Sequence, residues 1–279
     1  MSARVLVTGL DHPEGVAYDP EADVVWAGGE DGQLYRVPVE TGVAEEVARA
    51  PGFVLGVAVD GRGRVVLCVS SNGSVCAWDG AHIQRVVAGL KFPNYPAFAP
   101  DGTLFVSDSG DWGGGNGRLM RVDVDGSCEP FSHAVPNFTN GCAVSPDGEW
   151  LWVVESYVPV LSRFELATGR REEIRRFDGT VLDGLAFTAD GGLLIACYRP
   201  DRIYHLAESG AVEVVADDPQ GTLLAAPTNV CFVGPSLDRV VAANLGRWHL
   251  TLLDIGLVGA PPHRPERWAL DAVRVEVGG

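Results

Sequence analysis

Four oxygen-bearing residues occupy equivalent places in a phrase that recurs along this sequence. Glu14, Asn94, Asn140 and Asp183 each stand immediately before a short run of small and apolar residues. Two carboxylates and two amides, if brought together, offer hard oxygen ligands whose two negative charges balance one divalent cation. A cation held by only three or four protein groups keeps open positions for water and substrate, which favours a catalytic site over a structural one.

At any single position, an Asn or Asp before a strand can instead serve only to cap a turn. The recurrence of such residues in a sixfold repeat favours the metal site over that interpretation. The residues that precede the six copies, named the rim residues below, are Glu14, Leu55, Asn94, Asn140, Asp183 and Thr228. Successive rim residues are 39 to 46 positions apart, the period expected for a propeller blade of four strands and their turns.

Tight turns divide each copy into alternating apolar runs. Most copies continue into a turn such as Asp60-Gly61, Asp101-Gly102 or Asp147-Gly148, which is a strong hairpin signal between two strands. The sequence therefore predicts an all-β fold, a six-bladed β-propeller with four antiparallel strands per blade, as a single domain over residues 1–279. The run from Arg4 to Thr8 is expected to complete the last blade, and the run from Trp268 to Val275 is a candidate for a further closing strand.

The propeller architecture places the rim residues around one end of the central tunnel, because the first strand of each blade lines that tunnel. The loops between second and third strands open on the same face, named the top face below, and the Asp-Gly turns lie on the opposite face. We expect the top loops to wall a pocket above the rim. Expected wall residues include Asp111 and Trp112 in the glycine-rich segment 109–116, and Tyr157, Arg199 and Trp248 in other loops.

Composition excludes several classes of function. The formal net charge is −16 and the pI is near 4.7, without a Lys/Arg cluster, which argues against nucleic-acid binding. The sequence has neither a signal-peptide pattern nor 18 consecutive apolar residues, so we expect a cytoplasmic protein without membrane association. Its six cysteines show no CxxC spacing and are expected to be reduced, buried thiols. We expect a monomer or a small homo-oligomer.

The phrases around the rim residues resemble a known family of six-bladed propellers. His12-Pro13-Glu14-Gly15, Thr139-Asn140-Gly141, Leu182-Asp183-Gly184 and Ala196-Cys197-Tyr198 are similar to those of the gluconolactonase, regucalcin and luciferin-regenerating enzyme family. The resemblance covers essentially the whole chain. It implies that Glu14, Asn140 and Asp183 bind one divalent metal ion, with Ca²⁺ the expected ion and Mg²⁺, Mn²⁺, Zn²⁺ or Fe²⁺ as alternatives. It also implies that Asn94 contacts the substrate, that Asp183 transfers a proton, and that the reaction is hydrolysis of a small lactone.

The sequence departs from this family at the third rim. Sugar-lactone enzymes of the family often carry an arginine two residues before the amide at the third rim position, where this chain has Phe92, preceded by Lys91. Lys91 is therefore a candidate substrate contact, and a more apolar lactone stacked on Trp112 or Trp248 is an alternative to a sugar lactone. Two other functions also remain open: a phosphotriesterase-like hydrolase using the same metal site, and a non-catalytic propeller that binds protein partners.

Overall fold

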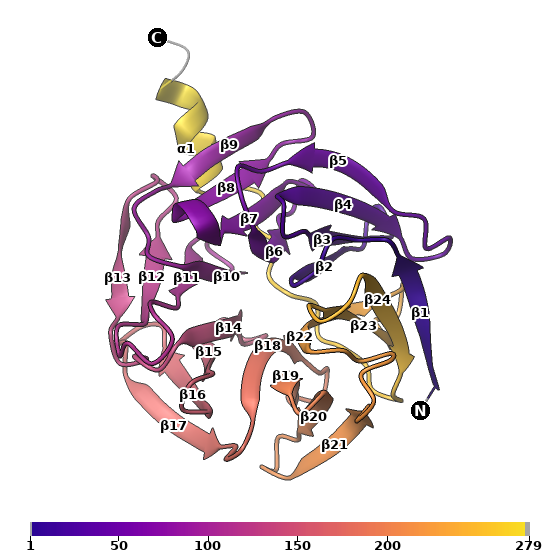
Figure 1. Ribbon diagram of the computed structural model, residues 1–279. Coiled ribbons are helices and arrows are strands. Elements are labelled where there is room, and N and C mark those ends of the chain that lie inside the picture. Colours follow the sequence, from indigo (N-terminus) through magenta and orange to yellow (C-terminus); the bar gives the residue numbers. More distant parts are fainter. Residues whose placement is uncertain (1, 277–279) are drawn as a thin grey trace.

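Six four-stranded antiparallel sheets form a closed ring around a central tunnel, which confirms the predicted propeller (Figure 1). The computed structural model describes residues 2–276. Each of the first five blades uses four consecutive strands. These strands are β2 (Val16–Asp19), β3 (Val24–Gly28), β4 (Gln33–Pro38), β5 (Glu45–Arg49), β6 (Val54–Val59), β7 (Val65–Val69), β8 (Ser74–Trp78), β9 (Ile83–Val87), β10 (Pro93–Phe98), β11 (Leu104–Asp108), β12 (Arg118–Val122), β13 (Cys128–Ser132), β14 (Thr139–Val144), β15 (Trp150–Glu155), β16 (Val160–Glu165), β17 (Arg171–Arg176), β18 (Val181–Phe187), β19 (Leu193–Arg199), β20 (Arg202–Leu206) and β21 (Val212–Asp217). A 3₁₀ turn, η1 (Ser70–Asn72), follows β7.

The sixth blade joins the two ends of the chain. It contains β22 (Pro227–Val233), β23 (Arg239–Asn244) and β24 (His249–Asp254), and its outer strand is β1 (Ser2–Thr8). Strand β1 pairs antiparallel with β24, with Ser2 opposite Asp254 and Thr8 opposite His249. The expected role of the N-terminal run is thereby confirmed. Because this pairing fastens the ring, the geometry of the tunnel depends on residues more than 240 positions apart.

Glycine allows the inner strands to approach one another closely beside the rim. It follows the rim residue in four blades, as Gly15, Gly56, Gly141 and Gly184. A Cβ atom on Gly15 would lie 2.2 Å from the carbonyl oxygen of Leu55, and one on Gly141 would lie 2.3 Å from that of Asp183. Since such distances are far below van der Waals contact, any larger residue would separate neighbouring inner strands and widen the ring of rim residues.

The hydrophobic core lies between neighbouring blades. The cluster between blades four and five, for example, packs Val154 and Leu161 of one sheet against Leu185 and Ile195 of the next. Side chains on the two faces of each strand alternate, so one face of every sheet contacts the preceding blade and the other contacts the following blade. This packing fixes each inner strand, and with it each rim residue, relative to the next.

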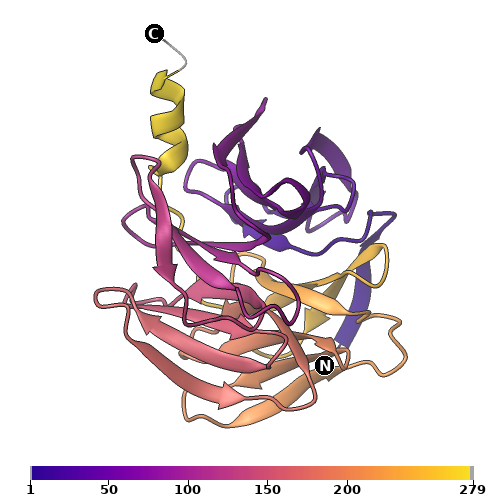
Figure 2. The same cartoon turned by 60° about the vertical axis from the view of Figure 1, so that its left-hand side comes forward.

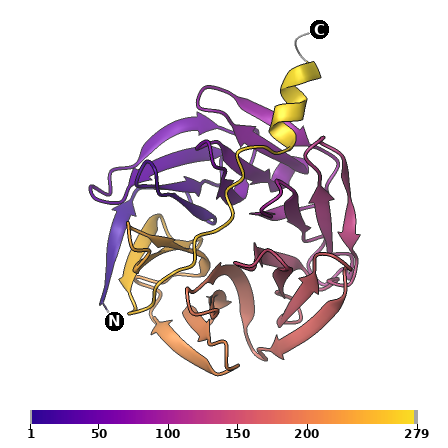
Figure 3. The ribbon, with the colours of Figure 1, turned by 180° about the vertical axis from the view of Figure 1, so that it is seen from behind.

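A C-terminal strap, residues 255–268, crosses the face opposite the rim (Figure 3). Its residues bond to turns of several blades: the Ala260 N–H donates to the Phe187 carbonyl (2.9 Å), and the Gly61 N–H donates to the Pro265 carbonyl (3.0 Å). At its end the buried Trp268 donates its indole N–H to an oxygen of Asp60 (2.8 Å).

Helix α1 (Ala269–Glu276) follows the strap and extends away from the blades (Figure 2). The expectation of a closing strand from Trp268 to Val275 is therefore wrong. The sixth sheet already has four strands, with β1 as its outer strand, and the segment that begins at Trp268 packs against blades two and three instead. Within residues 2–276, no helix has the length and apolar character needed to span a membrane.

Candidate metal centre

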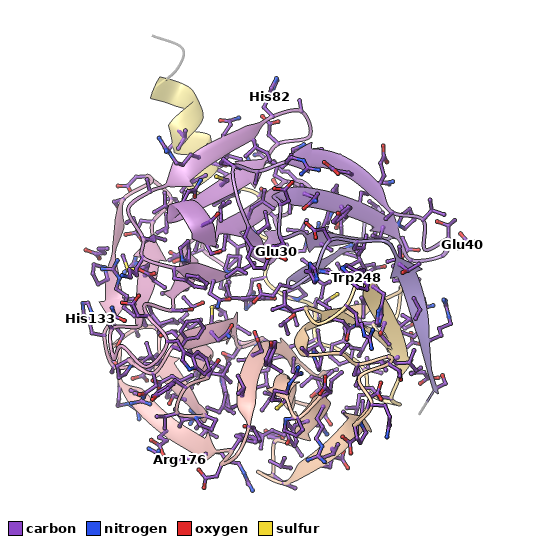
Figure 4. All side chains as sticks on the ribbon, viewed as in Figure 1. Glu30, Glu40, His82, His133, Arg176 and Trp248 are labelled. Carbon is purple, nitrogen blue, oxygen red and sulfur yellow. The ribbon has the colours of Figure 1, made fainter. Side chains whose placement is uncertain are left out.

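The register of the blades places the rim residues level with the start of the top loops. Pro93 pairs with Asp108 and Thr139 pairs with Glu155, so the loops that follow β11 and β15 begin beside Asn94 and Asn140. Glu30 and Trp248, from two other top loops, lie beside the central opening in Figure 4, whereas Glu40, His82, His133 and Arg176 lie at the outer edge. All six rim residues are buried.

Side-chain hydroxyls link the rim positions of neighbouring blades. Ser109 accepts a hydrogen bond from the Asn94 amide (3.1 Å) and donates one to the carbonyl of Thr139 (2.5 Å). Ser156 repeats the pattern one blade later, accepting from the Asn140 amide (3.1 Å) and donating to the carbonyl of Leu182 (2.5 Å). Thr228 donates to the carbonyl of Glu14 (2.7 Å) and so joins the last blade to the first.

These links determine how the Asn140 side chain is oriented. The single hydrogen of the Ser156 hydroxyl is donated to the Leu182 carbonyl, so Ser156 can only accept from Asn140, and the amide must present Nδ2 to it. The other amide atom, Oδ1, is buried and has no hydrogen-bond partner within residues 2–276. A buried acceptor without a donor is costly, and a cation would satisfy it.

Two buried carboxyls share this end of the tunnel. Burial raises the pKa of Glu14 to about 8. Burial also raises the pKa of Asp183 well above its usual range, and the negative charge of Glu14 adds to the effect. Both shifts reflect the free energy needed to keep two like charges in a desolvated place. Two carboxylates and one unpartnered amide oxygen form a donor set that fits a hard divalent cation.

Tyr95 forms a floor just below the rim. It follows Asn94 in the chain, and its hydroxyl donates to Oδ1 of Asn229 (3.3 Å), the residue that follows Thr228. Blades three and six are opposite one another in the ring, so this side chain crosses the tunnel. Beneath it, a cavity of about 260 Å³ is lined mainly by apolar residues of the first strands and is closed by strap residues 260–264. Tyr95 therefore lies between the rim site and this cavity.

Acidic residues at the ends of second strands brace the segments that enter the rim. Asp108 accepts hydrogen bonds from the backbone N–H groups of Lys91 (3.0 Å) and Phe92 (2.6 Å). Glu155 accepts one from the N–H of Asn137 (2.8 Å). The roles of Asp108, Glu155 and Ser156 are not among those expected from the sequence. The signal was present as an acid followed by serine at the same place in two blades, Asp108-Ser109 and Glu155-Ser156.

The expected substrate contacts lie in the top loops, but several of them bond to one another. Lys91 and Asp111 form an exposed ion pair with Nζ and Oδ1 3.2 Å apart. Trp112 and Tyr157 pack edge to face with their ring centroids 5.5 Å apart. The exposed Arg199 side chain pairs with Asp201 (3.1 Å) and lies over the ring of Tyr198. Asn94 is the one expected substrate contact that also belongs to the rim.

A second group of ionisable residues lies on the top face of blade one. Asp11, His12 and Glu30 each offer a potential ligand atom, and these atoms lie within 4.8 Å of one another. His12 Nδ1 is 3.3 Å from Asp11 and 3.0 Å from Glu30, and the other oxygen of Asp11 accepts from Gln33 (3.1 Å). The imidazole therefore links the two carboxylates. These contacts support the segment that leads into Glu14.

All six cysteines are free, as expected from their spacing, but only four are fully buried, because Cys128 and Cys231 are half-buried. Burial raises the pKa of the Cys142 thiol to about 12 and raises the pKa of the Cys68 and Cys231 thiols as well. Near neutral pH these thiols are therefore protonated, which makes them poor nucleophiles and poor metal ligands. The chemistry of the tunnel mouth thus depends on oxygen ligands.

Similar folds occur among solved structures. A gluconolactonase from Xanthomonas campestris has a TM-score of 0.77 and 19% identity, with 91% of this chain and 89% of that chain covered. Regucalcin from Agrobacterium tumefaciens, described as a calcium-binding protein, has a TM-score of 0.77 and 19% identity, with 94% and 97% covered. A luciferin-regenerating enzyme has a TM-score of 0.76 and 16% identity, with 95% and 99% covered.

Sequence comparison finds related proteins and a matching family model. The protein strictosidine synthase-like 6 of Arabidopsis thaliana is 25% identical over 210 residues, and strictosidine synthase-like 4 is 23% identical over 209 residues. In each case the match covers 67% of this chain and 56% of the relative, so this chain spans little more than half of those proteins. The family model described as the SMP-30/Gluconolactonase/LRE-like region matches residues 12–243, which include every rim residue. The chain therefore belongs to the SMP-30/gluconolactonase/LRE-like family.

Proposed function

We propose that this protein is a lactonase that hydrolyses a small cyclic ester with the help of one divalent cation held by Glu14, Asn140 and Asp183. The observation that carries the proposal is the buried, unpartnered Oδ1 of Asn140, whose orientation is set by Ser156. The buried carboxyls of Glu14 and Asp183 have raised pKa values without a nearby cation, and a bound divalent cation would favour their ionised forms, whose two charges balance it. The description of the related regucalcin as a calcium-binding protein favours Ca²⁺ as the ion.

A bound divalent cation would supply Lewis-acid polarisation of the lactone carbonyl and would lower the pKa of water in the site. Asp183 would accept a proton from the attacking water as the new C–O bond forms. The tetrahedral carbon would then release the ring oxygen, which takes up a proton to give a hydroxy acid. Asp183 would then return the proton that it accepted to the leaving oxygen.

Asn94 would stabilise the developing negative charge on the carbonyl oxygen. One N–H of its amide is donated to Ser109, which fixes the amide and leaves the second N–H for the substrate. A preorganised donor of this kind typically contributes about 10²–10³-fold in turnover. Tyr95 closes the tunnel beneath the substrate, so that the ester stays at the level of the rim.

The direct test is hydrolysis of lactones by the wild-type protein and by Asp183→Asn in the presence of Ca²⁺. The substitution keeps the shape of the side chain but removes a charge and the proton acceptor. We expect lactone turnover in the wild type and a loss of about 10²–10⁴-fold in the variant. Full activity in Asp183→Asn contradicts the assignment. Turnover of a phosphotriester in place of every lactone tested would favour the phosphotriesterase-like alternative.

A further inference from the structure

Four aromatic side chains form a continuous group on the top face of blades three and four. This group, named the aromatic platform below, consists of Phe92, Trp112, Phe138 and Tyr157. The ring centroids of Trp112 are 5.0 Å from Phe138 and 5.5 Å from Tyr157, and those of Phe92 and Phe138 are 5.7 Å apart. Phe92 and Phe138 are half-buried, whereas Trp112 is 55% exposed and Tyr157 is 50% exposed.

The platform is built on the same segments that hold the two rim amides. Phe92 and Phe138 each stand two residues before a rim amide, Asn94 and Asn140 respectively. Tyr157 directly follows Ser156, the residue that orients Asn140, and its N–H donates to the Asn137 carbonyl (3.0 Å). A molecule that reaches the rim amides from the top face therefore passes beside these rings.

Exposure of the platform is unusual for this protein. Among the described residues, the large hydrophobic side chains that are exposed comprise five valines and three aromatic residues. All three aromatic residues, Trp112, Tyr157 and Trp248, belong to top loops that follow a second strand. Trp248 packs against His12 on another part of the top face, with centroids 5.7 Å apart. Apolar surface gathered at one mouth in this way is typical of a binding site.

Phe138 has a backbone conformation that is unusual for a bulky residue. Its φ angle is 61°, in the left-handed region that a bulky residue rarely adopts. The flanking hydrogen bonds hold this conformation, including the Ser156 N–H donated to the Phe138 carbonyl (3.0 Å). Strained residues of this kind persist where the surrounding structure requires them, often at ligand sites.

Polar groups next to the platform are already paired. Lys91 is bonded to Asp111, and Asp111 also accepts from the Asn116 amide (3.1 Å). Aromatic rings can stack on the C–H faces of sugars, but sugar sites combine such rings with free polar groups for the hydroxyls. Beside the platform, Lys91 and Asp111 would have to break their ion pair before they could bind sugar hydroxyls. The exposed rings of Trp112 and Tyr157 need no such rearrangement.

We propose that the aromatic platform binds an aryl or alkyl substituent carried by the lactone ring, so that the protein prefers apolar lactones to polyhydroxylated ones. This inference deepens the proposed function and rests on it. Burial of an aryl group against Trp112 and Tyr157 removes apolar surface from water and adds edge-to-face ring contacts. Hydroxyl groups placed there would lose water without gaining partners.

The test compares three substrates: 5-phenyl-δ-valerolactone, unsubstituted δ-valerolactone and glucono-δ-lactone. We expect kcat/KM to be highest for the phenyl lactone, chiefly through a lower KM. In Trp112→Ala, the ratio of kcat/KM for the phenyl lactone to that for δ-valerolactone should fall about 10–100-fold. Trp112→Phe should restore most of this ratio. Trp150→Ala, a change in the neighbouring blade four at a ring that packs on Arg163 and not on the platform, is the matched control and should keep the wild-type ratio.

A binding measurement separates this inference from the proposed function. A phenyl-substituted δ-lactam, which resists hydrolysis, should bind the wild type more tightly than Trp112→Ala in calorimetry. If the lactam shows this difference while no lactone is hydrolysed, the platform is supported and the lactonase proposal fails. If lactones are hydrolysed without a preference for the phenyl group and Trp112→Ala leaves the ratio unchanged, the platform proposal is overturned.

Discussion

At the scale of single residues, two serine hydroxyls orient the rim amides of the proposed site. Ser156 sets which atom of the Asn140 amide is left free, and Ser109 does the same for Asn94. Each hydroxyl also ties its amide to the backbone of the next blade. Groups that orient a metal ligand in this way commonly contribute as much to affinity as a weak ligand does.

Ser156→Ala should therefore weaken cation binding while the fold remains intact. Without its acceptor, the Asn140 amide can rotate, and Oδ1 is no longer held in one place. We expect the Kd for Ca²⁺ measured by calorimetry to rise about 10–100-fold. Ser74→Ala provides the matched control, because Ser74 is a buried serine that hydrogen-bonds to Asn72 rather than to a rim residue. An unchanged Kd in Ser156→Ala would contradict the role of Ser156 in orienting Asn140.

The rim residues themselves could be recognised from the sequence because each precedes the same short phrase. The acid-serine pairs mark the positions of Ser109 and Ser156 in the sequence, but their contacts, like those of Phe138, join different blades and became evident only in the fold. The pairing of Lys91 with Asp111 was equally hidden, because each residue alone resembles a substrate contact. Only the three-dimensional structure shows that the two side chains form an ion pair.

At the scale of the strands, the glycines after the rim residues decide how tightly the ring closes. Gly141→Ala would place a methyl group against the Asp183 carbonyl and push the inner strands of blades four and five apart. Asn140 and Asp183 lie at this contact, so we expect both the melting temperature and the affinity for Ca²⁺ to fall. Calorimetry and thermal unfolding of the same preparation measure the two effects.

Gly80→Ala separates these effects from general destabilisation. Gly80 has a φ of 101° in a turn where a Cβ would meet no atom within 4 Å, so the substitution strains the backbone without moving a blade. It should lower the melting temperature but leave the affinity for Ca²⁺ unchanged. If Gly141→Ala, like Gly80→Ala, lowers the melting temperature without changing the affinity for Ca²⁺, the close approach at Gly141 does not position Asn140 and Asp183.

The strand pattern was predictable where turns and apolar alternation agreed, which covers most strands of the six blades. It failed after β24, where Trp268 and its neighbours were interpreted as a strand. Their apolar side chains are buried, as that interpretation required, but Trp268, Ala269 and Leu270 pack into the cluster between blades two and three. Burial of an apolar run does not by itself distinguish a strand from a helix, and here the burial comes from the junction of two blades and not from pairing with the sixth sheet.

At the scale of the whole molecule, the strap fastens the ring on the face opposite the rim. Trp268 is fully buried and bonds to Asp60, which also pairs with the buried Arg64. Trp268→Ala should lower the free energy of unfolding by about 3–5 kcal/mol, the usual cost of removing a large buried ring. Urea unfolding measures this change. Because the strap lies on the face opposite the rim, KM for a lactone should stay at its wild-type value in Trp268→Ala. Loss of activity without loss of stability would contradict a purely structural role for Trp268.

The proposed lactonase activity requires that blades one, four and five together bind a single divalent cation. The most direct measurement is a crystal structure of the protein grown with Ca²⁺, with the ion located by its anomalous scattering. We expect one ion at about 2.3–2.6 Å from side-chain oxygens of Glu14, Asn140 and Asp183. A rim without an ion at saturating Ca²⁺, or an ion held by a different set of residues, would contradict the account.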